Sequence, residues 1–187
     1  MNNIFVDFDG CIVNTIKAIC DLYNEDFKYY ENYIPINWWD IESWSFNECN
    51  CASPEYIDTY FNQQRLFDKL TYMDWAKEVL IELNKNHNIF VVSHGNPPNL
   101  IAKEIWIKEN LPFCHFIGVN LEIFKDKSCI DMNDGIFIDD CESNLVTSNS
   151  REKICFGELY QWNKNWNGTR CKNWMDVYEF VNKKGGS

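Results

Sequence analysis

Residues 4–10 have the sequence IFVDFDG, a short apolar run that ends in two acids and a glycine. The apolar positions do not alternate with polar ones, which is typical of a parallel strand that is covered on both faces. Asp7 and Asp9 therefore lie at the carboxyl end of a buried strand, where open α/β sheets bind their ligands. Gly10 suits a backbone that turns sharply there. Taken alone, the motif is equally typical of a strand that ends in an acidic turn.

The same pattern recurs along the chain, because further apolar runs are separated by segments with helical spacing. Strands are expected at residues 4–6, 89–92, 113–119, 136–138 and 153–156. Helices are expected at residues 12–30, 73–85, 99–110 and 174–181. Strands that alternate with helices predict an α/β fold with a mainly parallel, doubly wound sheet.

Residues 33–70 are rich in aromatic and polar side chains and contain no strand-like run. Within them, Ser53-Pro54-Glu55 predicts the start of a helix, because serine is a good cap and proline fits the first turn. We therefore expect a small, mainly helical cap inserted after the first strand. The predicted division is a core of residues 1–14 and 72–182, a cap of residues 15–71 and a flexible tail at residues 183–187.

The composition excludes several classes of partner. The 187-residue chain has a formal net charge of -11, whereas a nucleic-acid polymer or an anionic membrane needs a basic face. No apolar run approaches the length of a membrane span, and we expect a soluble cytoplasmic protein. The nine cysteines are scattered and odd in number, which favours free thiols in a reducing compartment over disulfides. Cys49 and Cys51 lack a second pair at zinc-site spacing.

Polar side chains follow the predicted strands and should converge, since the carboxyl ends of parallel strands lie at one edge of a sheet. They are Asp7, Asp9, Ser93, Asp139 and Asp140, and a preceding loop adds Lys127. Carboxylates held close together repel one another, and a hard cation such as Mg²⁺ relieves that repulsion. The lysine supplies the local positive charge that an anionic substrate needs in an acidic protein. The set predicts a metal-dependent phosphate site.

These residues resemble the four motifs of the haloacid dehalogenase (HAD) superfamily of phosphohydrolases, namely Asp7-Phe8-Asp9-Gly10, Ser93 after an apolar strand, Lys127, and Asp139-Asp140. More narrowly, the chain resembles the 5'(3')-deoxyribonucleotidase family. That likeness rests on Lys103 with Trp106, Asp126-Lys127, Ile136 to Asp140 with Asn144-Leu145, and Arg170 to Trp174. It runs from Ile4 to about Val181, strongly in the core and loosely in the cap. Ser93 departs from the family, which more often has threonine there.

The resemblance implies an HAD-like fold and a Mg²⁺-dependent phosphomonoesterase that acts on deoxyribonucleoside monophosphates. Asp7 would attack phosphorus to form an aspartyl-phosphate, while Asp9 would act as general acid and then as base. Lys127 would neutralise phosphoryl charge. The Ser93 hydroxyl and nearby backbone N–H groups would hold the remaining phosphoryl oxygens, which adds three predicted substrate contacts at Phe8, Gly10 and His94.

The same resemblance implies how the metal is held. The Asp7 side chain, the Asp9 backbone carbonyl and one carboxylate of the Asp139–Asp140 pair would bind Mg²⁺, with water completing the octahedron. Which member of the pair contacts the ion stays open. The resemblance also favours a homodimer.

Several residues have competing interpretations. Lys125 is an alternative to Lys127, although the Asp-Lys-Ser context favours Lys127. His94 is interpreted as a solvated turn residue rather than a base, and Lys103 as a charge on a helix face rather than a ligand. Five aromatic residues either stack on a nucleobase or form the small core of the cap: Phe27, Trp38, Trp39, Trp44 and Phe46.

Three alternatives to a nucleotidase stay open. A capped HAD phosphatase could act on another small phosphomonoester, such as a sugar phosphate. A catalytically silent nucleotide-binding relative is a further alternative, against which the intact set of acids argues. Paired acids, a hydroxyl and a lysine on a parallel sheet also describe a phospho-accepting receiver domain. In a receiver, however, the acceptor aspartate ends a middle strand, whereas the mid-chain strand here ends in Ser93. The preferred base and sugar and the position of the phosphate are not determined by the sequence.

Overall fold

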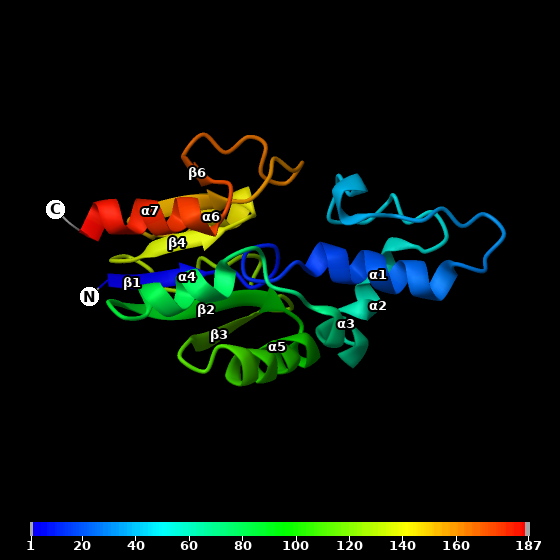
Figure 1. Ribbon diagram of the computed structural model, residues 1–187, viewed down its shortest axis with the longest axis horizontal. Coiled ribbons are helices and arrows are strands. Elements are labelled where there is room, and N and C mark those ends of the chain that lie inside the picture. Colours follow the sequence, from blue (N-terminus) through cyan, green and yellow to red (C-terminus); the bar gives the residue numbers. More distant parts are fainter. Residues whose placement is uncertain (1, 186–187) are drawn as a thin grey trace.

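The computed structural model describes residues 2–185, which form a six-stranded sheet with helices on its faces and a further group of helices at one end (Figure 1). The strand order is β3-β2-β1-β4-β5-β6, and all neighbouring strands are parallel. The strands are β1 (Asn2–Val6), β2 (His87–Gly95), β3 (His115–Asn120), β4 (Ile136–Asp139), β5 (Glu152–Phe156) and β6 (Thr169–Cys171). The predicted α/β fold with a parallel sheet is confirmed.

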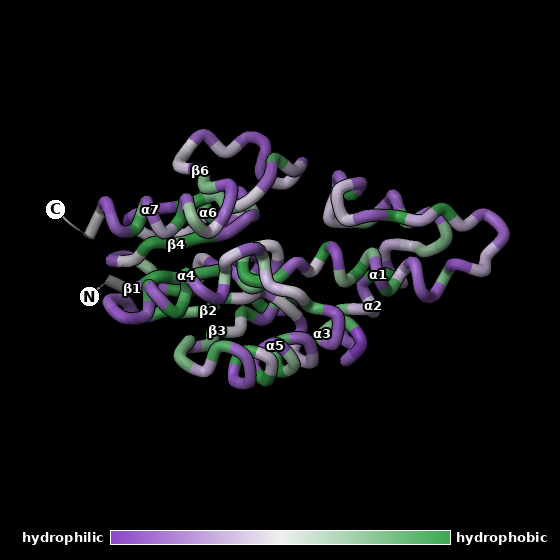
Figure 2. The backbone as a smooth tube through the Cα atoms, in the orientation of Figure 1, coloured by the Kyte–Doolittle hydropathy of each residue, from purple (hydrophilic) through white to green (hydrophobic). Residues whose placement is uncertain are grey.

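Helices cover both faces of the sheet because successive side chains of a buried strand point to opposite faces. In β1, Ile4 and Val6 belong to a core with α4 (Ala76–Leu83), α5 (Pro97–Asn110) and α7 (Trp174–Gly185). Phe5, between them, belongs to a second core with Leu145 of α6 (Glu142–Thr147). Figure 2 shows hydrophobic residues concentrated in these central strands. The sheet is therefore doubly wound, as predicted.

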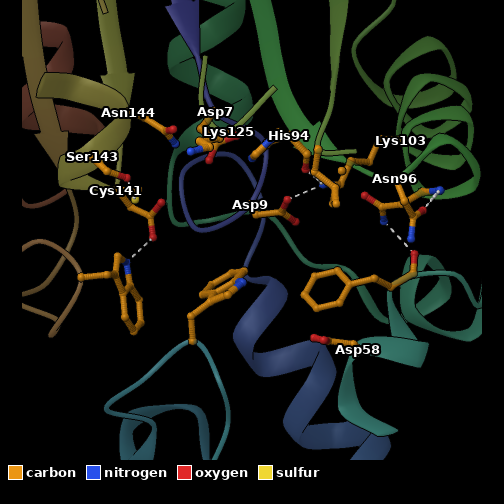
Figure 3. A pocket seen from close by; sticks show the side chains of 17 residues that line it. Asp7, Asp9, Asp58, His94, Asn96, Lys103, Lys125, Cys141, Ser143 and Asn144 are labelled. Carbon is orange, nitrogen blue, oxygen red and sulfur yellow. Dashed lines mark hydrogen bonds and ion pairs between the residues drawn. The ribbon is translucent and has the colours of Figure 1, made fainter. Parts of the chain in front are cut away.

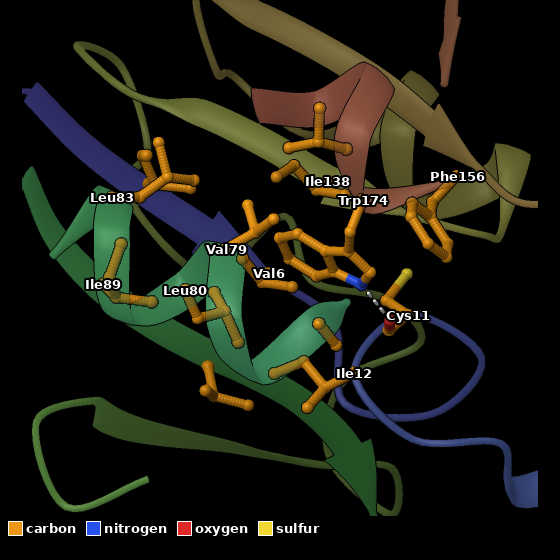
Figure 4. Close-up of a cluster of buried hydrophobic side chains, with 14 of the residues drawn as sticks. Val6, Cys11, Ile12, Val79, Leu80, Leu83, Ile89, Ile138, Phe156 and Trp174 are labelled. Atoms are coloured by element: carbon orange, nitrogen blue, oxygen red, sulfur yellow. Dashed lines mark hydrogen bonds between the residues drawn. The ribbon is translucent and has the colours of Figure 1, made fainter. Parts of the chain in front are cut away.

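Trp174 is the largest fully buried side chain of the first core (Figure 4). Its indole packs against Phe156, and its Nε1 donates a hydrogen bond of 2.8 Å to the Cys11 carbonyl oxygen. Cys11 lies in the loop between Asp9 and α1, so this bond ties the last helix to the segment that follows the first acids. The bond satisfies a buried polar pair that would otherwise destabilise the core.

The remaining helices lie beyond the carboxyl ends of the strands, at the end of the molecule opposite to both termini (Figure 1). They are α1 (Thr15–Phe27), the single-turn η1 (Trp38–Asp40), α2 (Pro54–Tyr60) and α3 (Gln64–Lys69). They enclose an apolar cluster of their own that includes Tyr23, Phe46 and Tyr60. The Ser53 side chain caps α2, as the sequence predicts. Residues 28–53 contain only η1, so this part is less helical than predicted.

The chain enters and leaves this group of helices at a single place. Val13 and Tyr72 form an antiparallel bridge, and the Asn14 N–H donates to the Thr71 carbonyl at 2.9 Å. The Met73 N–H donates to the Ile12 carbonyl at 2.8 Å. The two connections to the sheet are therefore joined side by side by backbone hydrogen bonds.

Several predicted boundaries are wrong for local reasons. The first helix starts at Thr15 rather than residue 12, because the Asn14 side chain accepts from the Lys17 N–H and caps it. Strand β2 continues through Ser93 to Gly95 because β3 pairs with it along that length, so His94 is not in a turn. The short elements α6 and β6 were not predicted. Residues 183–185, expected in a tail, belong to α7, while residues 186 and 187 lie outside the described residues.

All nine cysteines lie within the described residues and are free thiols, as predicted. The helices found between residues 2 and 185 are too short or too polar to cross a bilayer.

We expect Trp174→Phe to lower the free energy of unfolding by about 2 to 4 kcal/mol, because it leaves the Cys11 carbonyl without its donor and removes buried volume. Urea denaturation followed by circular dichroism measures the change. Trp39→Phe is the matched control, since Trp39 is 64% exposed and its replacement should change stability by less than about 0.5 kcal/mol. Equal effects of the two replacements would contradict the role assigned to Trp174.

Candidate active site

The carboxyl ends of β1 and β4 bring together a buried lysine and two acids. Lys127 has no exposed surface, and its Nζ lies 2.7 Å from Asp7 Oδ1 and 2.6 Å from Asp139 Oδ2. Asp7 follows β1 and Asp139 ends β4, and these strands are neighbours in the sheet. Asn144 donates to both carboxylate oxygens of Asp139 at 3.2 Å. The predicted convergence of Asp7, Asp139 and Lys127 is therefore present.

Asp140 completes a group of three acids. One carboxylate oxygen each from Asp7, Asp139 and Asp140 lies within 4.8 Å of the others, which makes this the one group among the described residues suited to a metal ion. The side chain of Asp9 is not part of it. Three hard oxygen donors fit Mg²⁺ better than a softer ion.

Burial makes this cluster costly to charge. It raises the pKa of Asp7 from 3.8 to about 7, since loss of water and the charges of Asp139 and Asp9 outweigh the attraction of Lys127. Burial and the same neighbours raise the pKa of Asp140 well above its usual value. For Lys127, burial disfavours the ammonium, but the adjacent carboxylates of Asp139 and Asp7 raise its pKa overall. The charge of the acids exceeds that of the lysine, which is the condition that a bound cation relieves.

The prediction that Lys103 is a charge on a helix face is wrong, because this second lysine is buried at the site. Lys103 is only 2% exposed, and its Nζ forms an ion pair with Asp9 Oδ2 (Figure 3). The same ammonium donates to Ser93 Oγ at 2.9 Å and to the His94 carbonyl at 3.3 Å. The other Asp9 oxygen accepts from the Thr15 hydroxyl at 2.7 Å. Lys103 thus links Asp9 to Ser93, and Ser93 itself has no exposed surface.

The loop after β1 is tightly constrained. Gly10 has a φ of +72°, and a Cβ there would lie 2.7 Å from Asp140 Oδ2, so only glycine fits. The Gly10 N–H donates to the Val13 carbonyl at 3.0 Å, and the Phe8 N–H donates to Asp7 Oδ1 at 2.7 Å. The Phe8 ring is buried against Trp106. Both N–H groups therefore have internal acceptors in this state of the protein.

These groups border a cavity of about 520 Å³, which lies in the range of about 300–1,000 Å³ typical of small-molecule sites. Asp7, Asp9, Asp140, Lys103 and Lys125 line it from the sheet side. Lys125 and Lys127 were alternatives for the lysine of the site, and they lie at different positions. Lys125 lines the cavity, whereas Lys127 does not line it and is buried against Asp7. His94 also lines the cavity, and its ring Nε2 lies 2.8 Å from the Phe124 carbonyl.

Of the five predicted aromatic contacts, only Trp44 lines the cavity. Phe27 and Phe46 are buried in the apolar cluster of α1 and α2, and Trp38 packs against the same cluster. Trp39 is mostly exposed. Hydrophobic burial thus explains most of these side chains.

Residues that the sequence did not predict as site residues also line the cavity, among them Asp58, Phe61 and Trp162. The ring of Trp44 lies 6.2 Å from that of Phe61 and 5.6 Å from that of Trp162, measured between centroids. The Trp162 indole stacks on Tyr160 at 4.3 Å, and its Nε1 donates to Asp140 Oδ2 at 2.9 Å. The only advance signal was the aromatic composition of the loop 157–168.

The sequence of this chain is similar to known nucleotidases. Residues 1–185 match the model of the family described as "5' nucleotidase, deoxy (Pyrimidine), cytosolic type C protein". The chain is also similar to a 5'(3')-deoxyribonucleotidase of Clostridium acetobutylicum, with 27% identity over 174 residues that cover 92% of this chain and 90% of the relative.

Solved structures show the same fold at low sequence identity. A predicted phosphatase from Clostridium acetobutylicum has a TM-score of 0.68 at 14% identity, covering 97% of this chain and 98% of its own. A haloacid dehalogenase-like hydrolase from Streptococcus pneumoniae has a TM-score of 0.64 at 14% identity with the same coverage. A HAD hydrolase from Bacillus subtilis, solved with bound magnesium, has a TM-score of 0.62 at 9% identity, again with that coverage.

We expect Asp7→Asn to raise the free energy of unfolding of the metal-free protein at pH 8. The raised pKa of Asp7 means that its contribution to stability is present below 3.8 and is lost as the pH rises through about 7. Asparagine has no charge and removes that loss, so the two proteins should agree near pH 4 and diverge by pH 8. Urea denaturation in EDTA at both pH values measures this. Asp74→Asn, at an exposed site, controls for loss of a surface acid, and a gap between Asp7→Asn and the native protein that stays constant with pH would refute the expectation.

Proposed function

Because this chain belongs to the cytosolic type C 5'-nucleotidase family, we propose that it removes phosphate from deoxyribonucleoside monophosphates through a phosphorylated Asp7. The family match confirms the HAD and nucleotidase resemblance, and the chain is a phosphoric monoester hydrolase with an HAD-type fold. The receiver and silent binding-module alternatives are thereby set aside. The substrate, the metal and the roles of single residues are the parts that we propose.

The observation that carries the proposal is the arrangement of two acids, each with its own buried lysine, at one cavity. Lys127 and the Phe8 N–H both contact Asp7 Oδ1, which orients that carboxylate and leaves Oδ2 to attack. The attack forms a bond from Asp7 Oδ2 to phosphorus and breaks the bond from phosphorus to the ester oxygen. Asp9, protonated at the start of this step, gives its proton to that oxygen as it leaves.

In the second step, water attacks the phosphorus of the aspartyl-phosphate, and Asp9 takes the proton that the water loses. The bond between phosphorus and Asp7 Oδ2 breaks, so inorganic phosphate leaves and Asp7 is restored. Lys103 holds Asp9 in place during both steps, together with the Thr15 hydroxyl. Ser93 contacts Lys103 rather than the cavity, so its contribution is to position that ammonium.

Asp7, Asp139 and Asp140 are the residues that would hold Mg²⁺, together with the Asp9 backbone carbonyl that the family resemblance implies. Their close approach and the raised pKa values of Asp7 and Asp140 support a cation at this position. Bound Mg²⁺ would neutralise negative charge on the phosphoryl group.

A nucleotide is favoured over a sugar phosphate by the aromatic wall of the cavity. Trp44, Phe61 and Trp162 are the rings that line it, and aromatic rings bind nucleobases by stacking, worth about 1 to 3 kcal/mol per base in single-stranded complexes. A sugar phosphate has no flat apolar face of that size. The similarity to a 5'(3')-deoxyribonucleotidase supports the same choice.

The test is phosphate release from a panel of deoxyribonucleotides, ribonucleotides and sugar phosphates, each with Mg²⁺ and with EDTA. We expect release that requires Mg²⁺ and favours deoxyribonucleotides. Release from sugar phosphates alone would discard the nucleotide assignment, while undiminished release in EDTA would discard the metal.

We expect Asp7→Asn to reduce turnover at least about 1,000-fold, because the amide cannot form the phosphorylated intermediate. Asp74→Asn should leave turnover unchanged. Circular dichroism and the denaturation midpoint establish that both variants are folded. Turnover of Asp7→Asn within tenfold of the native rate would exclude the mechanism.

We expect Trp162→Phe to weaken Mg²⁺ binding about tenfold, since it removes the hydrogen bond that orients Asp140. Isothermal titration of the substrate-free protein with Mg²⁺ measures this directly. Trp166→Phe is the matched control, because Trp166 lies in the same loop and donates to the Thr169 carbonyl instead. If both variants bind Mg²⁺ as the native protein does, Trp162 does not position Asp140.

A further inference from the structure

Arg170 lies in a sequence motif that the proposed reaction does not use. It belongs to β6, the strand at one edge of the sheet, and its side chain is half-buried. Within the part of the chain that the structure describes, its guanidinium forms no ion pair, and its hydrogen bonds both go to Asn163. Nη1 donates to Asn163 Oδ1 at 3.3 Å, and Nη2 donates to the Asn163 carbonyl at 2.8 Å. A planar guanidinium that gives two donors to one residue fixes the orientation of that residue.

Asn163 connects Arg170 to the backbone of Asp140. Asn163 has no exposed surface, and its Nδ2 donates to the Asp140 carbonyl and to the Glu158 carbonyl, each at 3.1 Å. Its Oδ1 also accepts from the Tyr160 N–H at 3.0 Å. Arg170 therefore holds a buried side chain that in turn holds one of the three clustered acids.

Trp162 makes a second connection from the same loop to Asp140. Its Nε1 donates to Asp140 Oδ2 at 2.9 Å, and its carbonyl accepts from the Glu142 N–H at 3.2 Å. Its ring lines the cavity and lies 5.6 Å from that of Trp44 between centroids. In Figure 1 the orange loop before β6 extends from the sheet toward the group of helices that carries Trp44. The loop 157–168 thus contacts Asp140 at its backbone and at its carboxylate.

An arginine that only stabilised the edge of the sheet would have contacts that end in the loop. The contacts of Arg170 continue through Asn163 to Asp140, whose carboxylate must stay close to Asp7 and Asp139 if the three acids are to share a cation. Groups that hold a metal ligand in place affect metal affinity even though they do not touch the ion.

We propose that Arg170 is a positioning residue of the active site, which acts through Asn163 to hold Asp140 and Trp162 in place at the wall of the cavity. Arg170 lies one step further from the cation than the residues that contact Asp140. The inference rests on the proposed function for the cation and adds a residue to that site.

The first test is the affinity of the substrate-free protein for Mg²⁺, measured by isothermal titration. Arg170→Lys keeps the charge but cannot reach both acceptors of Asn163 in the same geometry, so we expect affinity to fall about fivefold. Arg151→Lys is the matched control, because Arg151 is exposed, and it should bind Mg²⁺ as the native protein does. No loss in Arg170→Lys, or an equal loss in both variants, would overturn the inference.

The second test asks whether Arg170 acts through Asn163. Asn163→Ala should weaken Mg²⁺ binding at least as much as Arg170→Lys does. In the Asn163→Ala background, Arg170→Lys should add less than about a twofold further loss, because residues on one route have non-additive effects. Losses that multiply in full would show that Arg170 acts by another route, which contradicts the proposal.

The third test needs no metal and no turnover, and it decides the inference even where Asn163→Ala does not fold. Nuclear magnetic resonance measures how fast the indole N–H groups exchange with water, and the signals of Trp162 and Trp174 are identified by their absence in Trp162→Phe and Trp174→Phe. Arg170→Lys should speed exchange at Trp162 at least about threefold and leave Trp174 unchanged, because only the loop is released.

Faster exchange at both tryptophans would mean that Arg170 serves general stability, and unchanged exchange at Trp162 would mean that Arg170 does not hold the loop. Either result overturns the inference. If the native protein bound no Mg²⁺ while Arg170→Lys still sped exchange at Trp162 alone, the proposed metal would be refuted and the positioning role of Arg170 supported.

Discussion

The ammonium group of Lys127 between Asp7 and Asp139 is the contact on which the geometry of the site depends. The two acids come from neighbouring strands, and without a cation between them their burial would force the strand ends apart or protonate one of them. The loop before β4 must therefore deliver Lys127 to the edge of the sheet. The carboxylates in turn offset the cost of burying the ammonium. The strand order thus places the two acids side by side, and their charges require the lysine between them.

Asp7 and Asp9 are only two residues apart, yet they have different surroundings. Asp7 shares Lys127 with Asp139 at the end of β4, whereas Asp9 is held by Lys103 of α5 and Thr15 of α1. Similar acids with unequal neighbours can take different chemical roles, as a two-step phosphoryl transfer requires. The chain turns at Gly10, directly after Asp9, with a φ of +72°.

The parts of the site that could be predicted are those that follow from strand order. Apolar runs that end in Asp7 and Asp139 predict a shared edge, because parallel strands align their carboxyl ends. Lys103 could not be placed in this way. Its helix has a weak apolar periodicity, and its burial depends on Asp9 and Ser93, which are remote in sequence. Residues 28–53 follow no periodic pattern, so neither their lack of helices nor the single aromatic contact of Trp44 could be read from them.

The paired connections at Val13 and Tyr72 have a consequence for how such proteins diversify. The segment between them can change in length and shape while the backbone that carries Asp7 and Asp9 stays fixed at both ends. Its loops and helices supply Trp44, Asp58 and Phe61, which line the same cavity as Asp7 and Asp9. Changes in this segment can therefore alter which ligands the cavity accepts while Asp7 and Asp9 keep their positions. This separation is compatible with solved relatives that keep the fold at 9 to 14% identity.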